Sequence, residues 1–354
     1  MSKFLSKKYA NLKPYTPGEQ PKDSVYIKLN TNESPFPPSK KVKRQVVKEI
    51  NKLNLYPDPE CSSLTLAVAK SLGVDKENVL LTNGSDEILN FAFMAYCDKD
   101  TPAVFADITY GFYKVFAEIN GVESKIIPLR EDFSIKKEDY YNANGTIFIA
   151  NPNAPTGLTL SIDDIKKILE NNKDNIVVID QAYADFSGES AIKLINEYDN
   201  LIVTETFSKS RSFAGGRLGY GVASKEIIKD LNAIKYSTNP YNLDRLTIAS
   251  GLAIINDKKY FDSCVKKVVT VRESVKKELI SLGLNVTDSK ANFLFVESNL
   301  ISGENLYKKL REKGILVRYF NADRISNFVR VTVGSDCQMK AFIKAVKEIL
   351  KEIK

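Results

Sequence analysis

The sequence predicts an α/β protein in which a mostly parallel sheet lies between helices and a smaller α+β unit follows. Two observations predict this class. Short apolar runs rich in Val and Ile alternate with stretches of helical periodicity from about residue 60 to residue 240. After a long helical segment, the pattern changes to a compact mixture of strands and helices. Because continuous apolar runs are typical of strands buried on both faces, the first pattern indicates a parallel sheet covered by helices.

The first thirty residues predict an extended arm. They are polar and contain three prolines, which interrupt regular structure: Pro14, Pro17 and Pro21. The stretch has no apolar segment of the kind found in a secretion signal, and no apolar run in the chain approaches membrane-spanning length. We therefore expect a cytoplasmic protein.

Helices and strands alternate along the next part of the chain. The segment SSLTLAVAKSLG (62–73) is amphipathic at helical spacing. Five apolar runs bounded by Gly, Asn or Pro predict strands at 102–108, 124–129, 146–151, 175–183 and 200–207. The segment 225–234 and the long periodic stretch from Leu243 to Leu282 predict helix.

The C-terminal part predicts a compact α+β unit. Strand patterns at 291–297, 315–320 and 328–335 are interleaved with a helix at 305–314 and a terminal helix at 339–353. The boundary between the two units falls near residues 240–265. We divide the chain into an arm, a large domain and a small C-terminal domain, with bounds 1–27, 28–245 and 246–354.

Composition narrows the possible functions. The chain of 354 residues contains no histidine, so it works without the commonest acid–base residue. Four cysteines have no metal-binding spacing, and we expect no bound metal: Cys61, Cys97, Cys264 and Cys337. The net charge of +7 is spread along the chain, and small anionic substrates suit it as well as nucleic acid does. We expect neither a nucleic-acid nor a membrane partner.

Polar loops follow the predicted strands, where parallel sheets collect their chemistry: 82–87, 107–113, 151–157, 180–186 and 206–210. Each loop has an ordinary interpretation by itself. NGSDE is typical of a turn before a helix, although the N–H groups of Ser85 and Asp86 could equally bind a phosphate. Asp180 is costly to bury without a cation or donor, and a lysine at a strand end, such as Lys209, can lose its proton through desolvation. Together, at the strand ends of one sheet, these loops predict one pocket.

The lysine segment resembles a known motif. SKSRSFAGGR places Lys209 eight residues before Arg217 and is similar to the lysine motif of the fold-type I pyridoxal-phosphate aminotransferases. NPNAPTG, and DQAY 29 residues before the lysine, match that group in order and spacing. Further stretches look like the histidinol-phosphate aminotransferases: LKPYTPG, KLNTNESP, LYPDP, NGSDE and VRVTVG. The resemblance covers essentially the whole chain. It implies a mostly parallel seven-stranded sheet in the large domain, an arm packed on the small domain and partner subunit, and a homodimer with shared active sites.

The resemblance also implies pyridoxal 5′-phosphate as cofactor. Lys209 would hold the cofactor as a Schiff base and later carry a proton from the substrate α-carbon to the cofactor. Asp180 would pair with the pyridinium nitrogen, Tyr183 would donate to the phenolate oxygen, and Tyr110 would stack on the ring. The cofactor phosphate would be bound by Ser85, Asp86, Thr206, Ser208 and Arg217.

Further residues are implied for the substrate and the dimer. Arg330 matches the arginine that holds the substrate carboxylate or phosphate, and Arg318 and Tyr15 match positions near the distal phosphate. Asn32 is also counted among the substrate-binding residues. Tyr56 would arrive from the partner subunit. An ordinary interpretation of the two arginines is a solvated strand edge, but arginine flanked by β-branched residues fits an inward-facing anion site better.

Two positions depart from the family pattern. An asparagine commonly stands immediately before PTG and bonds the cofactor's phenolate oxygen, whereas this chain has Ala154 there and Asn153 one place earlier. Either Tyr183 makes that bond alone, or Asn153 or a water molecule substitutes, and we count Asn153 among the cofactor-binding residues. Gln181 replaces a frequent glutamate, with little expected consequence. Arg211 has no assigned role, and we expect an ordinary surface side chain.

The resemblance implies a transaminase of histidine biosynthesis that moves an amino group between L-glutamate and imidazole-acetol phosphate. Two alternatives share the fold: an aromatic or broad-specificity amino-acid aminotransferase, and a threonine-phosphate decarboxylase. The sequence separates these poorly, because substrate choice depends on how side chains are placed. A ligand-sensing regulator with an inactive aminotransferase fold is a third alternative. Such regulators usually carry an added DNA-binding domain, for which the arm has no room, and the intact Lys209, Asp180 and Tyr183 also argue against it.

Overall fold

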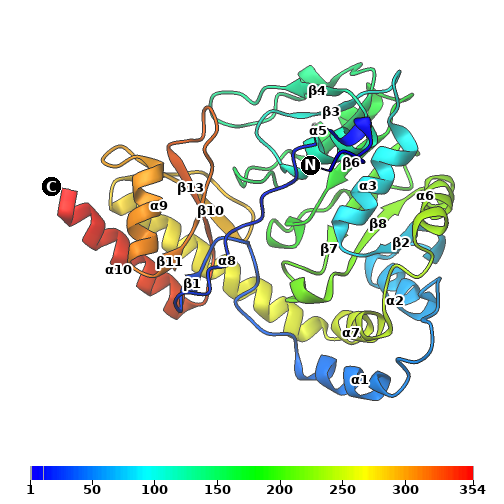
Figure 1. The fold of residues 1–354 in the computed structure, drawn as a ribbon, viewed down its shortest axis with the longest axis horizontal. Coiled ribbons are helices and arrows are strands. Elements are labelled where there is room, and N and C mark those ends of the chain that lie inside the picture. The colour runs from blue at the N-terminus through cyan, green and yellow to red at the C-terminus, as the bar shows by residue number, and fades with distance from the viewer. Residues whose placement is uncertain (1, 11, 354) are drawn as a thin grey trace.

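The computed structural model of the protein, which describes residues 2–10 and 12–353, contains two layered units joined by a long helix (Figure 1). The larger unit is built on a seven-stranded sheet and the C-terminal unit on a four-stranded antiparallel sheet. A short two-stranded pairing ties the N-terminal arm to the C-terminal unit. This arrangement confirms the fold class predicted from the sequence.

The large sheet is mostly parallel. Its strands lie in the order β2-β8-β7-β6-β5-β3-β4. Strand β8 runs antiparallel to both of its neighbours, and the other described pairs involving β3 to β7 are parallel. The bounds are β2 Val79–Thr82, β3 Ala103–Ala106, β4 Ser124–Ile127, β5 Thr146–Ala150, β6 Val177–Asp180, β7 Leu201–Thr206 and β8 Gly219–Ala223.

Both faces of this sheet are buried, because successive residues of each strand point into two different cores. Ile149, Ile179 and Val203 belong to one core, while Phe148 and Val178 belong to the other. The first core is closed by α1 Lys40–Ile50, α2 Ser62–Leu72, α5 Ile162–Glu170 and α7 Arg245–Ile255. The second is closed by α3 Ser85–Tyr96, α4 Phe112–Asn120 and α6 Lys225–Thr238. This double cover explains why the central strands appear in the sequence as continuous apolar runs.

The C-terminal unit packs helices against one antiparallel sheet of order β12-β13-β10-β9. Its elements are β9 Leu284–Val286, β10 Phe293–Ser298, α9 Gly303–Glu312, β12 Arg318–Tyr319, β13 Phe328–Thr332 and α10 Asp336–Ile353. Leu294 and Val331 of the sheet share one core with Leu306 of α9 and Phe342 of α10. The predicted strands and helices of this part are therefore present.

One long helix was expected from Leu243 to Leu282, and the structure divides it. Helix α7 ends at Ile255, and α8 begins at Lys258 and continues to Ser281. Asn256 and Asp257 interrupt the apolar periodicity, and Asp257 leaves the helical conformation with φ −114° and ψ 49°. Helix α8 then contacts the 3₁₀ turn Ala184–Phe186 of the large unit as well as β9, β10 and α10. Our division of the chain after residue 245 stays a prediction.

The arm connects the two units (dark blue in Figure 1). Its β1, Ile27–Lys28, pairs in parallel with β11, Ile315–Leu316, of the C-terminal unit. Nearer the N-terminus, the Lys13 N–H donates to Glu118 Oε2 of α4 over 3.3 Å.

The other 3₁₀ turns are Lys7–Tyr9, Lys76–Asn78, Lys137–Tyr140, Ala191–Leu194 and Ala214–Gly216. Within the described ranges, no helix is both long enough and apolar enough to cross a membrane.

Candidate active site

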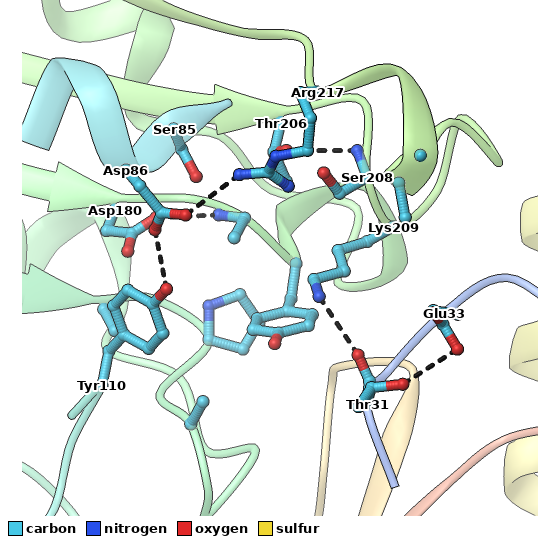
Figure 2. Close-up of a pocket in the computed structure, with 17 residues that line it drawn as sticks. Thr31, Glu33, Ser85, Asp86, Tyr110, Asp180, Thr206, Ser208, Lys209 and Arg217 are labelled. Carbon is cyan, nitrogen blue, oxygen red and sulfur yellow. Dashed lines mark hydrogen bonds and ion pairs between the residues drawn. The ribbon is translucent and has the colours of Figure 1, made fainter. Parts of the chain in front are cut away.

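A cavity of about 330 Å³ lies at the carboxyl ends of β5, β6 and β7 and the start of α3 (Figure 2). Seventeen residues line it: Thr31, Glu33, Ser85, Asp86, Tyr110, Ala150, Pro152, Ala154, Asp180, Ala182, Tyr183, Thr206, Ser208, Lys209, Ala214, Gly215 and Arg217. Most of the residues predicted to bind the cofactor are therefore brought to one place. Their roles stay predictions.

Lys209 is the one lysine among the lining residues of this cavity. It follows β7 by three positions, and its side chain extends into the open space (Figure 2). Its Nζ donates to the backbone oxygen of Thr31 over 3.4 Å and lies 5.8 Å from the centroid of the Tyr183 ring. The amine is therefore held by one long hydrogen bond, which leaves it free to reach a bound molecule.

Asp180 ends β6 and is buried at the cavity wall. Its Oδ2 accepts from the Tyr113 hydroxyl at 3.1 Å, and its Oδ1 accepts from Thr204 Oγ1 at 3.1 Å and from the Ala182 N–H at 3.2 Å. Burial raises the pKa of Asp180 to about 6 even though these three donors oppose the shift. A cation beside this carboxylate would offset that cost of burial.

The start of α3 forms an anion-binding end of the cavity. Gly84 precedes the helix, and no side chain caps its first N–H groups. Arg217 reaches across this point, and its Nη2 lies 3.1 Å from Asp86 Oδ2. Gly84 has φ +75° and ψ 168°, a backbone conformation that residues with a side chain rarely adopt, and it leaves room for the Arg217 guanidinium. Helix N–H groups, a guanidinium and the lining hydroxyls of Thr206 and Ser208 together suit a phosphate.

Tyr110 lies at the same end of the cavity as the start of α3. Its hydroxyl donates to Asp86 Oδ1 over 2.7 Å (Figure 2). Its ring meets that of Tyr113 edge-on, with centroids 5.6 Å apart and an interplanar angle of 88°. Burial raises the pKa of Tyr110 well above its ordinary value. The ring is thus fixed as a neutral aromatic wall of the cavity.

A second cavity of about 480 Å³ shares part of its lining with the first: Thr31, Tyr110, Ala154, Tyr183 and Lys209. The residues predicted to bind substrate all line it: Tyr15, Asn32, Arg318 and Arg330. The two cavities therefore meet at Lys209.

Two arginines face each other in the second cavity. Arg318 of β12 and Arg330 of β13 are directly paired across the antiparallel ladder. Like charges in such a pair repel, so the arrangement is unfavourable unless an anion or other acceptor lies between them. Arg330 Nη2 donates to the backbone oxygen of Asn30 over 3.2 Å. The Nε of Arg330 is buried without an acceptor in the described part of the chain. Burial lowers the pKa of Arg330.

Arg318 is also bonded to the arm. Its Nη1 donates to the backbone oxygen of Pro17 at 3.1 Å, and its Nη2 donates to the backbone oxygen of Thr16 at 3.0 Å. Tyr15, the preceding arm residue, packs against Phe112 with ring centroids 4.4 Å apart. Arg318 therefore holds the arm beside the cavity, and its predicted contact with a phosphate stays a prediction.

Tyr56 is not brought into either cavity. Its side chain is 78% exposed and stacks on Tyr241 with ring centroids 4.6 Å apart. The backbone oxygen of Tyr56 accepts a hydrogen bond from Arg245 Nη1 over 2.9 Å. Its predicted role in a partner subunit's site stays a prediction.

Asn153 is near the cavity but is not among its lining residues. Its Nδ2 donates to the Ile108 oxygen at 2.9 Å and to Thr156 Oγ1 at 3.1 Å, and its Oδ1 accepts from Thr109 Oγ1 at 2.8 Å. The amide is therefore bonded within the loops, while the methyl group of Ala154 lines both cavities.

Several residues of the site were not predicted from the sequence. Thr31 and Glu33 line the first cavity, and Thr31 Oγ1 donates to Glu33 Oε2 over 2.8 Å. Tyr113 and Thr204 do not line it but bond Asp180. A signal existed for Thr204, because it is the polar residue that directly follows three apolar residues of its strand, and it pairs in register with Asp180.

The expectation that Arg211 is an ordinary surface residue is wrong. Its guanidinium carbon lies 5.2 Å from the Phe207 ring centroid and 4.4 Å from that of Phe261. Buried Glu205 lies nearby and accepts a hydrogen bond from the Tyr220 hydroxyl, and burial raises the pKa of Glu205 to about 8. Arg211 is thus packed between rings and beside acidic groups behind the lysine loop.

Comparisons with known proteins support one family. The family model for aminotransferase class I and II matches residues 24–346. The histidinol-phosphate aminotransferase of Brachyspira hyodysenteriae is 50% identical over 353 residues, 99% of this chain and 100% of that protein. The protein of the same name from Clostridium acetobutylicum is 48% identical over 351 residues, again 99% and 100%.

Solved structures agree on the fold. The histidinol-phosphate aminotransferase from Sinorhizobium meliloti, in complex with pyridoxal-5′-phosphate, superimposes with a TM-score of 0.86. The match covers 93% of this chain and 92% of that one at 21% identity. The family resemblance inferred from the motifs is confirmed: the chain belongs to the class I and II aminotransferases.

Proposed function

We propose that this aminotransferase uses pyridoxal 5′-phosphate to move an amino group from L-histidinol phosphate to 2-oxoglutarate, giving imidazole-acetol phosphate and L-glutamate. The observation that carries the proposal is the Arg318–Arg330 pair, which faces a cavity that meets the cofactor cavity at Lys209. Relatives about half identical to the chain are histidinol-phosphate aminotransferases, which supports the same substrate.

The residues of the first cavity fit the cofactor. Asp180 is a buried carboxylate that a protonated ring nitrogen would neutralise. Lys209 offers the one lysine amine in the lining, and the start of α3 with Arg217 offers donors for a phosphate. Bound pyridoxal phosphate supplies an electron sink for the substrate α-carbon.

The residues of the chain would transfer the proton and hold the cofactor in place. Lys209 Nζ would accept the proton released from the substrate α-carbon and would deliver it to the cofactor. Asp180 would keep a proton on the ring nitrogen, and Tyr183 would donate to the phenolate oxygen. The phosphate would be bound by the N–H groups of Ser85 and Asp86, by the hydroxyls of Thr206 and Ser208, and by the guanidinium of Arg217.

The second cavity supplies substrate recognition. A phosphate placed beside Arg330 would give its buried Nε an acceptor and would screen its repulsion with Arg318. The distal carboxylate of glutamate has the same sign of charge and would use the same arginine in the return half of the reaction. One anion site can therefore serve both substrates.

We also propose a homodimer in which Tyr56 reaches the partner's cavity. Support comes from the exposed apolar side chains of Leu53, Leu55 and Tyr56, which lie together in one segment. The cytoplasmic location expected from the sequence is part of this proposal.

Arg330→Gln tests the anion site. The variant should lower kcat/KM for L-histidinol phosphate by about 10- to 100-fold, the range that a charge-assisted hydrogen bond of ~1.5–3 kcal/mol allows. Turnover of L-histidinol, which has no phosphate, should change little. Both are measured in the first half of the reaction, as the change in the visible absorbance of the cofactor without 2-oxoglutarate, because the return half would use the same arginine.

The matched control is Arg130→Gln, because Arg130 is exposed and does not line either cavity. It should behave as the parent does. An Arg330→Gln protein that loses the two substrates equally would contradict the assignment of Arg330 to the phosphate.

A further inference from the structure

Asn32 is held in an unusual conformation by the C-terminal unit. Its side chain is 1% exposed, and its backbone has φ +55°, a region that asparagine tolerates better than most residues. Its N–H donates to Thr332 Oγ1 over 2.9 Å, and its carbonyl oxygen accepts from Asn292 Nδ2 over 3.0 Å. The backbone of Asn32 is therefore fixed from the side of β10 and β13.

The Thr332 hydroxyl also orients the Asn32 amide. Because Thr332 Oγ1 accepts from the Asn32 N–H, its own proton is free to be donated, and Asn32 Oδ1 lies 3.1 Å away. If the amide were turned over, Thr332 would receive two donors and its buried proton would lose this acceptor. The amide nitrogen of Asn32 therefore faces the other way, toward Tyr183.

Asn32 Nδ2 donates to the Tyr183 hydroxyl over 2.9 Å. An amide nitrogen can only donate, so the tyrosine oxygen must accept this bond. The single hydroxyl proton of Tyr183 then has to point elsewhere, and Tyr183 lines both cavities. Among the residues that the structure describes, no protein group accepts that proton.

We propose that Asn32 is a positioning residue that makes Tyr183 an obligate donor to the phenolate oxygen of the cofactor, and that Thr332 sets Asn32 for this task. The proposal rests on the use of pyridoxal phosphate proposed above. It answers the question raised by Ala154, whose methyl group cannot donate. Asn153 does not replace it, since its amide is already bonded to Ile108, Thr109 and Thr156.

A donor at the phenolate oxygen stabilises the anionic form of that oxygen. It therefore lowers the pKa of the visible chromophore that the bound cofactor makes with Lys209. Loss of the donor should raise this pKa, and the change can be followed without measuring turnover.

The experiment is a pH titration of the visible absorbance of the cofactor-loaded protein. Asn32→Asp keeps the shape of the side chain, but its carboxylate would accept the Tyr183 proton, so the pKa should rise by about one unit or more. Asn32→Gly suits the positive φ and removes the amide, and it should raise the pKa by less. Thr332→Val should shift it in the same direction, whereas Thr332→Ser, which keeps the hydroxyl, should match the parent.

A double variant separates positioning from a general structural effect. If Asn32 acts through Tyr183, Asn32→Gly should add no shift to that of Tyr183→Phe. Parental titration of both Asn32→Asp and Asn32→Gly would overturn the inference, as would a full Asn32→Gly shift in the Tyr183→Phe background. A parent protein that shows no cofactor band at all would overturn the proposed function and this inference with it. A normal parent band with unshifted variants would overturn the inference alone.

Discussion

Lys209→Ala should give a folded protein that no longer traps pyridoxal phosphate covalently on borohydride reduction and that loses transaminase activity by at least about 10⁴-fold. The reason is that Lys209 is the one lysine lining the cavity, and its Nζ is held by a single long bond to the Thr31 oxygen. No other lysine amine of the lining can take over bond formation or the proton transfer. The check is mass spectrometry of the reduced protein together with an assay of glutamate formation.

Lys28→Ala is a matched control for this variant. Lys28 is close by, because it bonds the cavity residue Glu33, but it does not line the cavity. It should still trap the cofactor at Lys209. A Lys209→Ala protein that remains covalently labelled after reduction would show that another residue carries the chemistry.

Asp180→Asn should lower kcat by about 10²- to 10³-fold while the protein stays folded, the range typical of losing one preorganised charge in an active site. The neutral amide keeps the shape of the carboxylate and can still meet Tyr113 and Thr204. It cannot hold a proton on the ring nitrogen of the cofactor. Single-turnover kinetics measure the loss of catalytic rate, and far-ultraviolet circular dichroism checks that the variant remains folded.

The behaviour of Asp180 should also depend on pH. Because burial raises its pKa to about 6 in the free protein, the carboxyl group is largely neutral below that pH. Cofactor affinity of the parent should then fall as the pH drops below about 6, and this loss should be weaker in Asp180→Asn. Asp163→Asn, at an exposed position in α5, should behave as the parent does. An Asp180→Asn protein with parental kcat would contradict the role given to this carboxylate.

The sequence predicted the central strands well because their physical signal is local. Strands β3 to β7 are short apolar runs, as burial on both faces requires. Strand β8, by contrast, begins with Gly-Tyr-Gly and carries little strand signal. Its Gly219 is needed for close approach, since a Cβ there would lie 2.4 Å from the Ser85 nitrogen. That requirement comes from the packing of β8 on α3 and is invisible in a local pattern.

The residues of the site likewise fall into two groups, those that the sequence predicted and those that it did not. Lys209, Asp180 and Arg217 were predictable because they stand in motifs at strand ends. The partnership of Asn32 with Tyr183 joins residues 151 positions apart, and that of Asn32 with Thr332 joins residues 300 apart. No periodicity or composition encodes such contacts. Arg211 was misjudged for the same reason, because Phe261, which covers it, belongs to a distant helix.

The most direct test of the substrate is the first half of the reaction with the cofactor-loaded parent protein. L-Histidinol phosphate, L-phenylalanine and L-threonine phosphate are each mixed with it, without 2-oxoglutarate, and the visible absorbance is recorded. We expect L-histidinol phosphate to bleach the cofactor band at the lowest concentration and the highest rate. If phenylalanine or threonine phosphate bleaches the band while L-histidinol phosphate leaves it unchanged, the proposed substrate is wrong.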